Sequence, residues 1–158
     1  MKAVRKWNAT GIAALGVLAL ATSAMAASSA DVVKERQASM KAQAADLKAV
    51  TDYARGKGDK DGALKGAHDL AERASKASKL FPKGTSSADL PGVSKAKPEI
   101  WTDNAKFMAI WKGMQDKSAK LGDLIKSGSP DDVKMAATDL AKTGCGACHS
   151  SYREAETQ

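Results

Sequence analysis

Cys145-Gly146-Ala147-Cys148-His149 ends nine residues before the C-terminus of this 158-residue chain. Two cysteines that are separated by two residues and followed directly by a histidine are typical of covalent haem attachment. The thiols add to the two vinyl groups of the haem, and the imidazole ligates its iron. On a helix, these three side chains share one face, because they fall at positions i, i+3 and i+4. The motif therefore predicts one covalent haem c per chain, anchored by Cys145 and Cys148, with His149 as an iron ligand.

The cysteine pair has three other interpretations: a redox dithiol, half of a zinc site, and a disulfide. A redox dithiol requires a pair at the start of a helix in a βαβ unit, whereas this pair lies near the end of a chain that is predicted to be helical. A zinc site needs two further ligands, yet besides His149 the chain offers only one histidine, the distant His68. A structural helical bundle in which the cysteines form a disulfide is the third alternative.

The first 26 residues are predicted to be a cleaved signal peptide. Lys2, Arg5 and Lys6 give a positive start, residues 11–21 are apolar, and Ala24-Met25-Ala26 is a small-x-small cleavage site. The apolar run is shorter than the ~20 residues that span a bilayer. We therefore expect export to the periplasm, a mature domain of residues 27–158, and no membrane span in the mature chain.

The charge of the mature chain excludes some function classes. The formal net charge of +7 falls to +4 when Lys2, Arg5 and Lys6 are removed with the signal peptide. The remaining lysines are scattered among acids, so we expect no nucleic-acid partner, which requires a concentrated basic stripe. An acidic redox partner, in the periplasm or at the membrane, is compatible with this charge. We found no carboxylate pair or catalytic triad, so we expect no enzyme.

Apolar periodicity predicts an all-α protein. Stripes at three- and four-residue steps indicate helices over about 29–55 and 61–80, a third from Thr102 or Asp103, and a fourth that starts at Asp131 and leads into the haem motif. Residues 82–98 are rich in Gly, Ser, Pro and Lys and have no helical period. The sequence therefore predicts an antiparallel four-helix bundle with one long crossover loop.

Three further segments, together with the terminal haem motif, carry a resemblance to a known family. The mature chain resembles the class II cytochromes c, the family of cytochrome c prime, over essentially its whole length. The matching segments are Arg36-Gln37-Ala38-Ser39-Met40, Lys97-Pro98-Glu99-Ile100-Trp101 and Tyr152-Arg153. Class I cytochromes c place the same motif near the N-terminus and find a methionine ligand downstream, where this chain has none.

The resemblance implies that Met40 faces the sixth coordination site of the iron. In this family that position holds a ligating methionine in low-spin members and a non-ligating residue in five-coordinate, high-spin members. We predict that His149 and Met40 both ligate the iron and that the protein carries electrons, since this ligand pair raises the reduction potential. The alternative is a five-coordinate haem that binds NO or CO at a vacant distal site, with Met40 as a packing residue.

The resemblance also assigns residues around the haem. It implies that Arg36 pairs with a haem propionate and that Gln37 lies beside it. Arg153 lies over the proximal side of the haem or simply ends its helix as a favourable cation. Among the remaining residues we expect His68 at the surface and the other mature-chain methionines, Met108, Met114 and Met135, in packing roles. A homodimer that forms through the first two helices is compatible with the resemblance. The stripes of small residues on these helices would serve the core of a monomer equally well.

Overall fold

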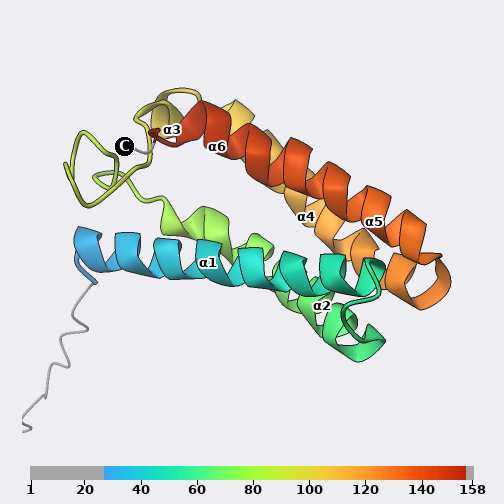
Figure 1. Ribbon diagram of the computed structural model, residues 1–158. Coiled ribbons are helices and arrows are strands. Elements are labelled where there is room, and N and C mark those ends of the chain that lie inside the picture. Colours follow the sequence, from blue (N-terminus) through green and yellow to red (C-terminus); the bar gives the residue numbers. More distant parts are fainter. Residues whose placement is uncertain (1–26, 156–158) are drawn as a thin grey trace, which may run out of the picture.

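The computed structural model describes residues 27–155, so the predicted signal peptide lies outside the described residues. Four helical rods lie side by side, and each runs antiparallel to the rod before it in the chain (Figure 1). The first three rods are α1 (Ser29–Ala54), α2 (Lys60–Ala77) and α4 (Asn104–Ser127). The fourth consists of α5 (Pro130–Asp139), a π-helix (Leu140–Gly146) and α6 (Ala147–Tyr152). A 3₁₀ turn (Ser78–Leu80) extends α2, and a short helix, α3 (Glu99–Thr102), precedes α4. The predicted all-α four-helix bundle is confirmed.

The helix starts follow from local hydrogen bonding. The Ser28 hydroxyl accepts the backbone N–H of Asp31 at 3.2 Å, and an Asp59 carboxylate oxygen accepts that of Gly62 at 2.7 Å. Ser129 and Asp132 form a reciprocal capping box at the start of α5, where Pro130 occupies the first turn. These caps satisfy backbone donors that have no partner inside the helix.

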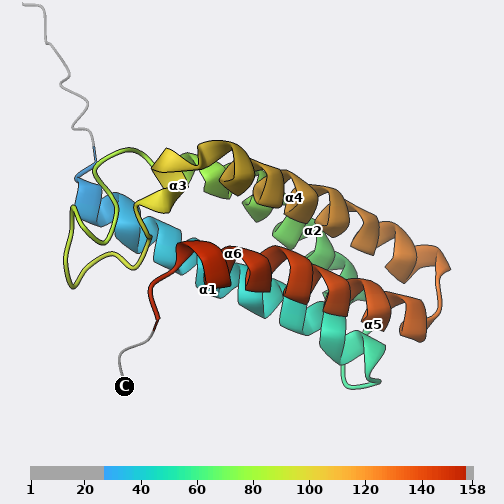
Figure 2. The same ribbon diagram turned by 90° about the horizontal axis from the view of Figure 1, so that it is seen from above.

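The helices form a closed ring of neighbours, in which α1 packs on α2, α2 on α4, α4 on the fourth rod, and the fourth rod on α1 (Figure 2). The α1–α2 contact is close at Gly66, where a Cβ atom would lie 2.7 Å from the carbonyl oxygen of Asp46. Glycine at this position lets the two backbones approach. Across the same contact, Arg73 Nε donates to an Asp46 carboxylate oxygen at 2.8 Å.

The long connection between α2 and α4 folds back over one end of the bundle and pairs with the end of the chain. Ala96 and Arg153 form an isolated antiparallel bridge. The backbone N–H of Lys97 donates to Tyr152 O at 3.0 Å, and that of Glu154 donates to Lys95 O at 2.8 Å. The residues that follow the haem motif are therefore tied to the crossover segment, at the end of the bundle that carries the motif.

The fourth rod differs from prediction because it is not α-helical throughout. Its π-helical segment contains Gly144 and Cys145 and ends at Gly146. A Cβ on Gly144 would lie 3.2 Å from Met114 Cγ, so the absence of a side chain allows this segment to pack closely against α4. π-helical segments often occur at functional sites.

Two of the three methionine predictions are wrong. Met114 is 5% exposed and belongs to the core, but Met108 is 43% and Met135 65% exposed. Both lie on the outer faces of their helices. The buried stripe of α4 runs through Phe107, Trp111 and Met114, and that of α5 runs through Val133 and Ala137.

No helix within residues 27–155 is both long enough and apolar enough to cross a bilayer.

Candidate functional site

A cavity of about 530 Å³ opens at the end of the bundle where the crossover segment lies. Most of its lining is apolar, which is typical of cofactor and ligand sites. Residues of α1 form one wall and residues of the fourth rod form another, with α4 and the crossover segment completing the enclosure. The lining consists of Arg36, Gln37, Met40, Lys41, Gln43, Ala44, Leu47, Phe81, Lys95, Ala96, Ile100, Ile110, Trp111, Met114, Cys145, Cys148, His149, Tyr152 and Arg153.

The predicted attachment residues meet at this cavity. Cys145, from the π-helix, and Cys148 and His149, from α6, all line it. Both cysteines are free thiols rather than a disulfide, and both are half-buried. Burial raises the pKa of Cys145, and burial together with the neighbouring Cys145 raises the pKa of Cys148 to about 11. Neither thiol is an activated thiolate of the kind that a redox dithiol uses.

The imidazole of His149 is suited to bind a metal ion. Its side chain is solvent-accessible but partly enclosed by the cavity wall, and this enclosure, with the nearby charge of Arg153, lowers its pKa. The neutral form, which carries a free nitrogen lone pair, is therefore favoured at neutral pH. His149 presents this ligand from α6, across the cavity from α1.

The α1 wall contains Met40, as the resemblance implies. Met40 is half-buried and packs against the core. Gln43, one turn further along α1, is 5% exposed and lines the same cavity. Its Nε2 atom lies 4.0 Å from the Met40 sulfur and 3.3 Å from the Ser39 hydroxyl oxygen. The wall opposite His149 therefore holds one thioether and one buried amide.

Arg36 lines the cavity and is only 5% exposed. Its Nη1 atom donates to Leu80 O and Thr85 Oγ1, and its Nη2 atom donates to Thr85 O and Ser94 Oγ, at 2.9 to 3.3 Å. Its Cζ atom also lies 4.6 Å from the centre of the Phe81 ring. Arg36 thus binds the crossover segment to α1, a role that the sequence analysis did not predict.

The guanidinium of Arg36 has no counter-charge among the described residues. Burial lowers the pKa of Arg36, and no carboxylate within residues 27–155 forms an ion pair with it. A buried charge without an opposite charge is costly. An anionic group in the cavity, such as a haem propionate, would supply one.

Gln37, which the resemblance places beside Arg36, is exposed at the mouth of the cavity. Its Nε2 atom donates to Val93 O at 3.1 Å, so it too holds the crossover segment. Lys41, Lys95 and Arg153 also line this mouth and are exposed. The rim is therefore mainly cationic and suits an anionic substituent of a cofactor.

Three aromatic side chains, those of Phe81, Trp111 and Tyr152, line the cavity, and Phe107 packs against two of them. Phe81 and Phe107 meet edge to face with their centroids 4.9 Å apart, and Tyr152 packs against Phe107 at 5.4 Å. Trp111, which is 3% exposed, lines the cavity beside them. Its Nε1 is the one fully buried side-chain nitrogen or oxygen within residues 27–155 that lacks a hydrogen-bond partner. Such a donor costs free energy unless an acceptor is provided, which points to a group that occupies the cavity.

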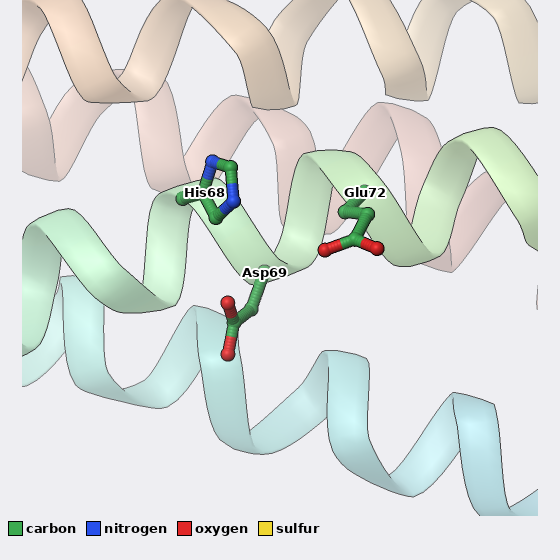
Figure 3. A group of neighbouring side chains, drawn as sticks. All are labelled: His68, Asp69 and Glu72. Carbon is green, nitrogen blue, oxygen red and sulfur yellow. The ribbon is translucent and has the colours of Figure 1, made fainter.

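His68 lies away from the cavity, exposed on α2, as expected for a surface histidine. Potential ligand atoms of His68, Asp69 and Glu72 lie within 4.8 Å of one another (Figure 3). However, Asp69 is paired with Lys65 and Glu72 with Lys76. Carboxylates that already have cationic partners are no reason to assign a metal here.

The site fits a covalently bound haem. Two unlinked thiols and a neutral imidazole converge on one apolar cavity that also contains a buried cation without a counter-ion and a buried donor without an acceptor. Sequence reasoning missed Gln43 and Trp111 as polar groups of this site. Gln43 carried a signal, because it interrupts the apolar stripe of α1 one turn after Met40.

Comparison with known proteins agrees with this chemistry. The family model described as cytochrome C' matches residues 31–153. A cytochrome c' of Alcaligenes xylosoxydans xylosoxydans is 30% identical over 126 residues, which cover 78% of this chain and 94% of the relative.

Solved structures of cytochrome c prime from Alcaligenes xylosoxidans have the same fold. A ferrous variant with bound NO is 26% identical and superposes with a TM-score of 0.71. A ferric variant complexed with nitrite is 27% identical, with a TM-score of 0.70. Each comparison covers 82% of this chain and 98% of the solved chain. With the family match, the four-helix fold and the Cys145–Cys148–His149 site in agreement, the chain belongs to the cytochrome c' family and binds haem c covalently.

Proposed function

We propose that this protein is a periplasmic cytochrome that binds a small gas, NO or CO, at the distal face of its haem, and that it is not an enzyme. The observation that carries this proposal is the α1 wall opposite His149, where Met40, Ala44 and Leu47 line an apolar space beside the attachment residues. The NO complex of a relative supports the same assignment. A bound haem would supply the iron to which such a gas binds.

Different residues of this chain hold the haem and shape the space for the gas. Cys145 and Cys148 anchor the cofactor, and His149 presents a neutral imidazole from α6. Arg36 and Gln37 hold the crossover segment against α1, and Arg36 would supply a positive charge for a haem propionate. The apolar residues of α1 exclude water and limit the size of a ligand that can enter. None of these residues needs to gain or lose a proton for reversible binding.

An absorption spectrum of the reduced, haem-loaded protein before and after addition of CO tests the proposal. We expect a high-spin ferrous spectrum that changes to that of a CO complex immediately on mixing. A low-spin ferrous spectrum that CO leaves unchanged would refute gas binding. The oxidised spectrum provides the matching check of the ferric spin state.

A second candidate function is electron transfer with His149 and Met40 as axial ligands. It is favoured by the position of Met40, whose half-buried thioether lines the cavity across from His149. A Met40→Leu variant separates the two functions, because leucine keeps an apolar side chain but removes the sulfur. Conversion of low-spin to high-spin iron would support electron transfer, and an unchanged spectrum would exclude Met40 as a ligand.

A further inference from the structure

The α1 wall of the cavity carries a buried amide that the gas-binding proposal does not use. Gln43 is 5% exposed and lines the cavity between Met40 and Leu47. It stands on the same helix as Met40, whereas His149 comes from α6. Gln43 therefore lies on the wall where a distal iron ligand would be enclosed.

The hydrogen bonds of this amide are weak. Its Nε2 atom donates to Ser39 Oγ at 3.3 Å and to Met40 Sδ at 4.0 Å. Typical N–H···O distances are about 2.9 to 3.0 Å, and a thioether sulfur is a weak acceptor. Exchange of the sulfur for a stronger acceptor would therefore improve the hydrogen bonding of Gln43 at little cost.

The other polar donors of the cavity are less well placed for this role. The Nη atoms of Arg36 are engaged by Leu80, Thr85 and Ser94 of the crossover segment. The Nε1 atom of Trp111 has no partner, but it belongs to α4 rather than to the wall that holds Met40. Gln37, the other amide of α1 that lines the cavity, is exposed and donates to Val93 O. Gln43 is thus the buried amide donor beside Met40 on α1.

We propose that Gln43 is the distal hydrogen-bond donor of this haem site and that it favours anionic oxygen ligands, of which nitrite is the probe, over CO. The inference rests on the proposed binding of ligands at the distal face. Hydrogen bonds to charged acceptors are stronger than those to neutral ones, and CO is a poor acceptor. Donors in the distal pocket influence which ligands a haem protein binds.

Nitrite titration of the ferric, haem-loaded protein tests this assignment, with CO titration of the reduced protein as the second readout. We expect Gln43→Leu to weaken nitrite binding about tenfold while the affinity for CO stays within twofold. A purely structural role would change both affinities together. Gln43→Ala provides a second variant without the donor if leucine disturbs folding.

Each substitution is made both in the wild-type chain and in a Met40→Ala chain, in which a ligand can reach the iron whether or not Met40 ligates it. Gln115→Leu is the matched control, because Gln115 donates to Ala74 O and does not line the cavity. It should leave both affinities unchanged.

The two proposals fail in different ways. A wild-type protein that ignores CO, while the Met40→Ala protein binds it, refutes the proposed gas-binding function but still allows the Gln43 comparison. Equal nitrite affinities of Met40→Ala with and without Gln43→Leu would overturn the assignment of Gln43. An equal loss of nitrite and CO affinity would overturn it as well, since that result indicates general distortion of the site.

Discussion

The two sides of α1 differ in how completely the polypeptide satisfies its own groups. Toward α2, Gly66 allows close backbone contact, and Arg73 forms an ion pair with Asp46. Toward the cavity, Arg36 is buried without a counter-charge, and Gln43 has only long hydrogen bonds. Because buried polar groups normally have partners, the second side identifies the place where the cofactor completes the structure.

The largest expected effect is the loss of the cofactor itself. Replacement of both Cys145 and Cys148 by alanine removes both thioether anchors, so no covalent haem should remain. Mass spectrometry of the intact protein and a haem stain on a denaturing gel measure this directly. Covalent haem that persists in the double variant would show that the cavity between α1 and α6 is not the attachment site.

The next prediction compares two arginines on opposite sides of α1. Arg36→Met should lower the free energy of unfolding by about 3 kcal/mol, because it removes four hydrogen bonds between α1 and the chain that follows α2, and the Leu80 carbonyl loses its donor from Arg36. Arg73→Met should cost less than about 1 kcal/mol, since the Arg73 side chain is 41% exposed. Denaturant unfolding of the two haem-loaded variants measures both values. Equal losses would contradict the difference between the two sides.

Helix packing on the α2 side is tested by two matched glycine substitutions. Gly66→Ala places a Cβ 2.7 Å from Asp46 O and should destabilise the protein by roughly 1 to 3 kcal/mol. Gly113→Ala on α4 meets no atom within 4 Å and should stabilise it by about 0.5 to 1 kcal/mol. Thermal unfolding shows the sign of each change. A neutral Gly66→Ala would mean that α1 and α2 are less closely packed than described.

The smallest expected effect concerns two tryptophan N–H groups. Trp101 Nε1 already donates to Phe81 O at 3.1 Å, whereas Trp111 Nε1 lacks a partner within the described chain. In the haem-loaded protein each change to phenylalanine should cost about 1 kcal/mol, and Trp111→Phe alone should also shift the haem absorption bands. If Trp111→Phe is neutral and leaves the spectrum unchanged, its N–H does not serve the cofactor.

The helices and the position of the haem motif could be predicted from local sequence. Apolar periodicity located the four rods, and Asp131 and Asp132 indicated the start of the last one, which begins one residue earlier, at Pro130. The π-helical segment could not be predicted, because a π-helix has no strong sequence signature and here depends on the contact of Gly144 with Met114.

The attachment residues could be predicted from a local pattern, unlike the contacts that complete the site. Cys145, Cys148 and His149 form one contiguous motif, so their proximity needs no knowledge of the fold. Arg36 reaches Thr85 and Ser94 across about fifty residues of chain, and that pairing exists only once the crossover segment has folded over α1. Long-range contacts of this kind leave no local pattern in a single sequence.

Titration of the reduced, haem-loaded protein with nitric oxide tests the central claim most directly, namely that the cavity between α1 and α6 leaves the distal face open to a small ligand. We predict that the absorption spectrum converts to that of a nitrosyl complex and saturates at one NO per chain. A spectrum that remains low-spin and unchanged through several equivalents of NO would contradict the account and favour a haem closed by Met40.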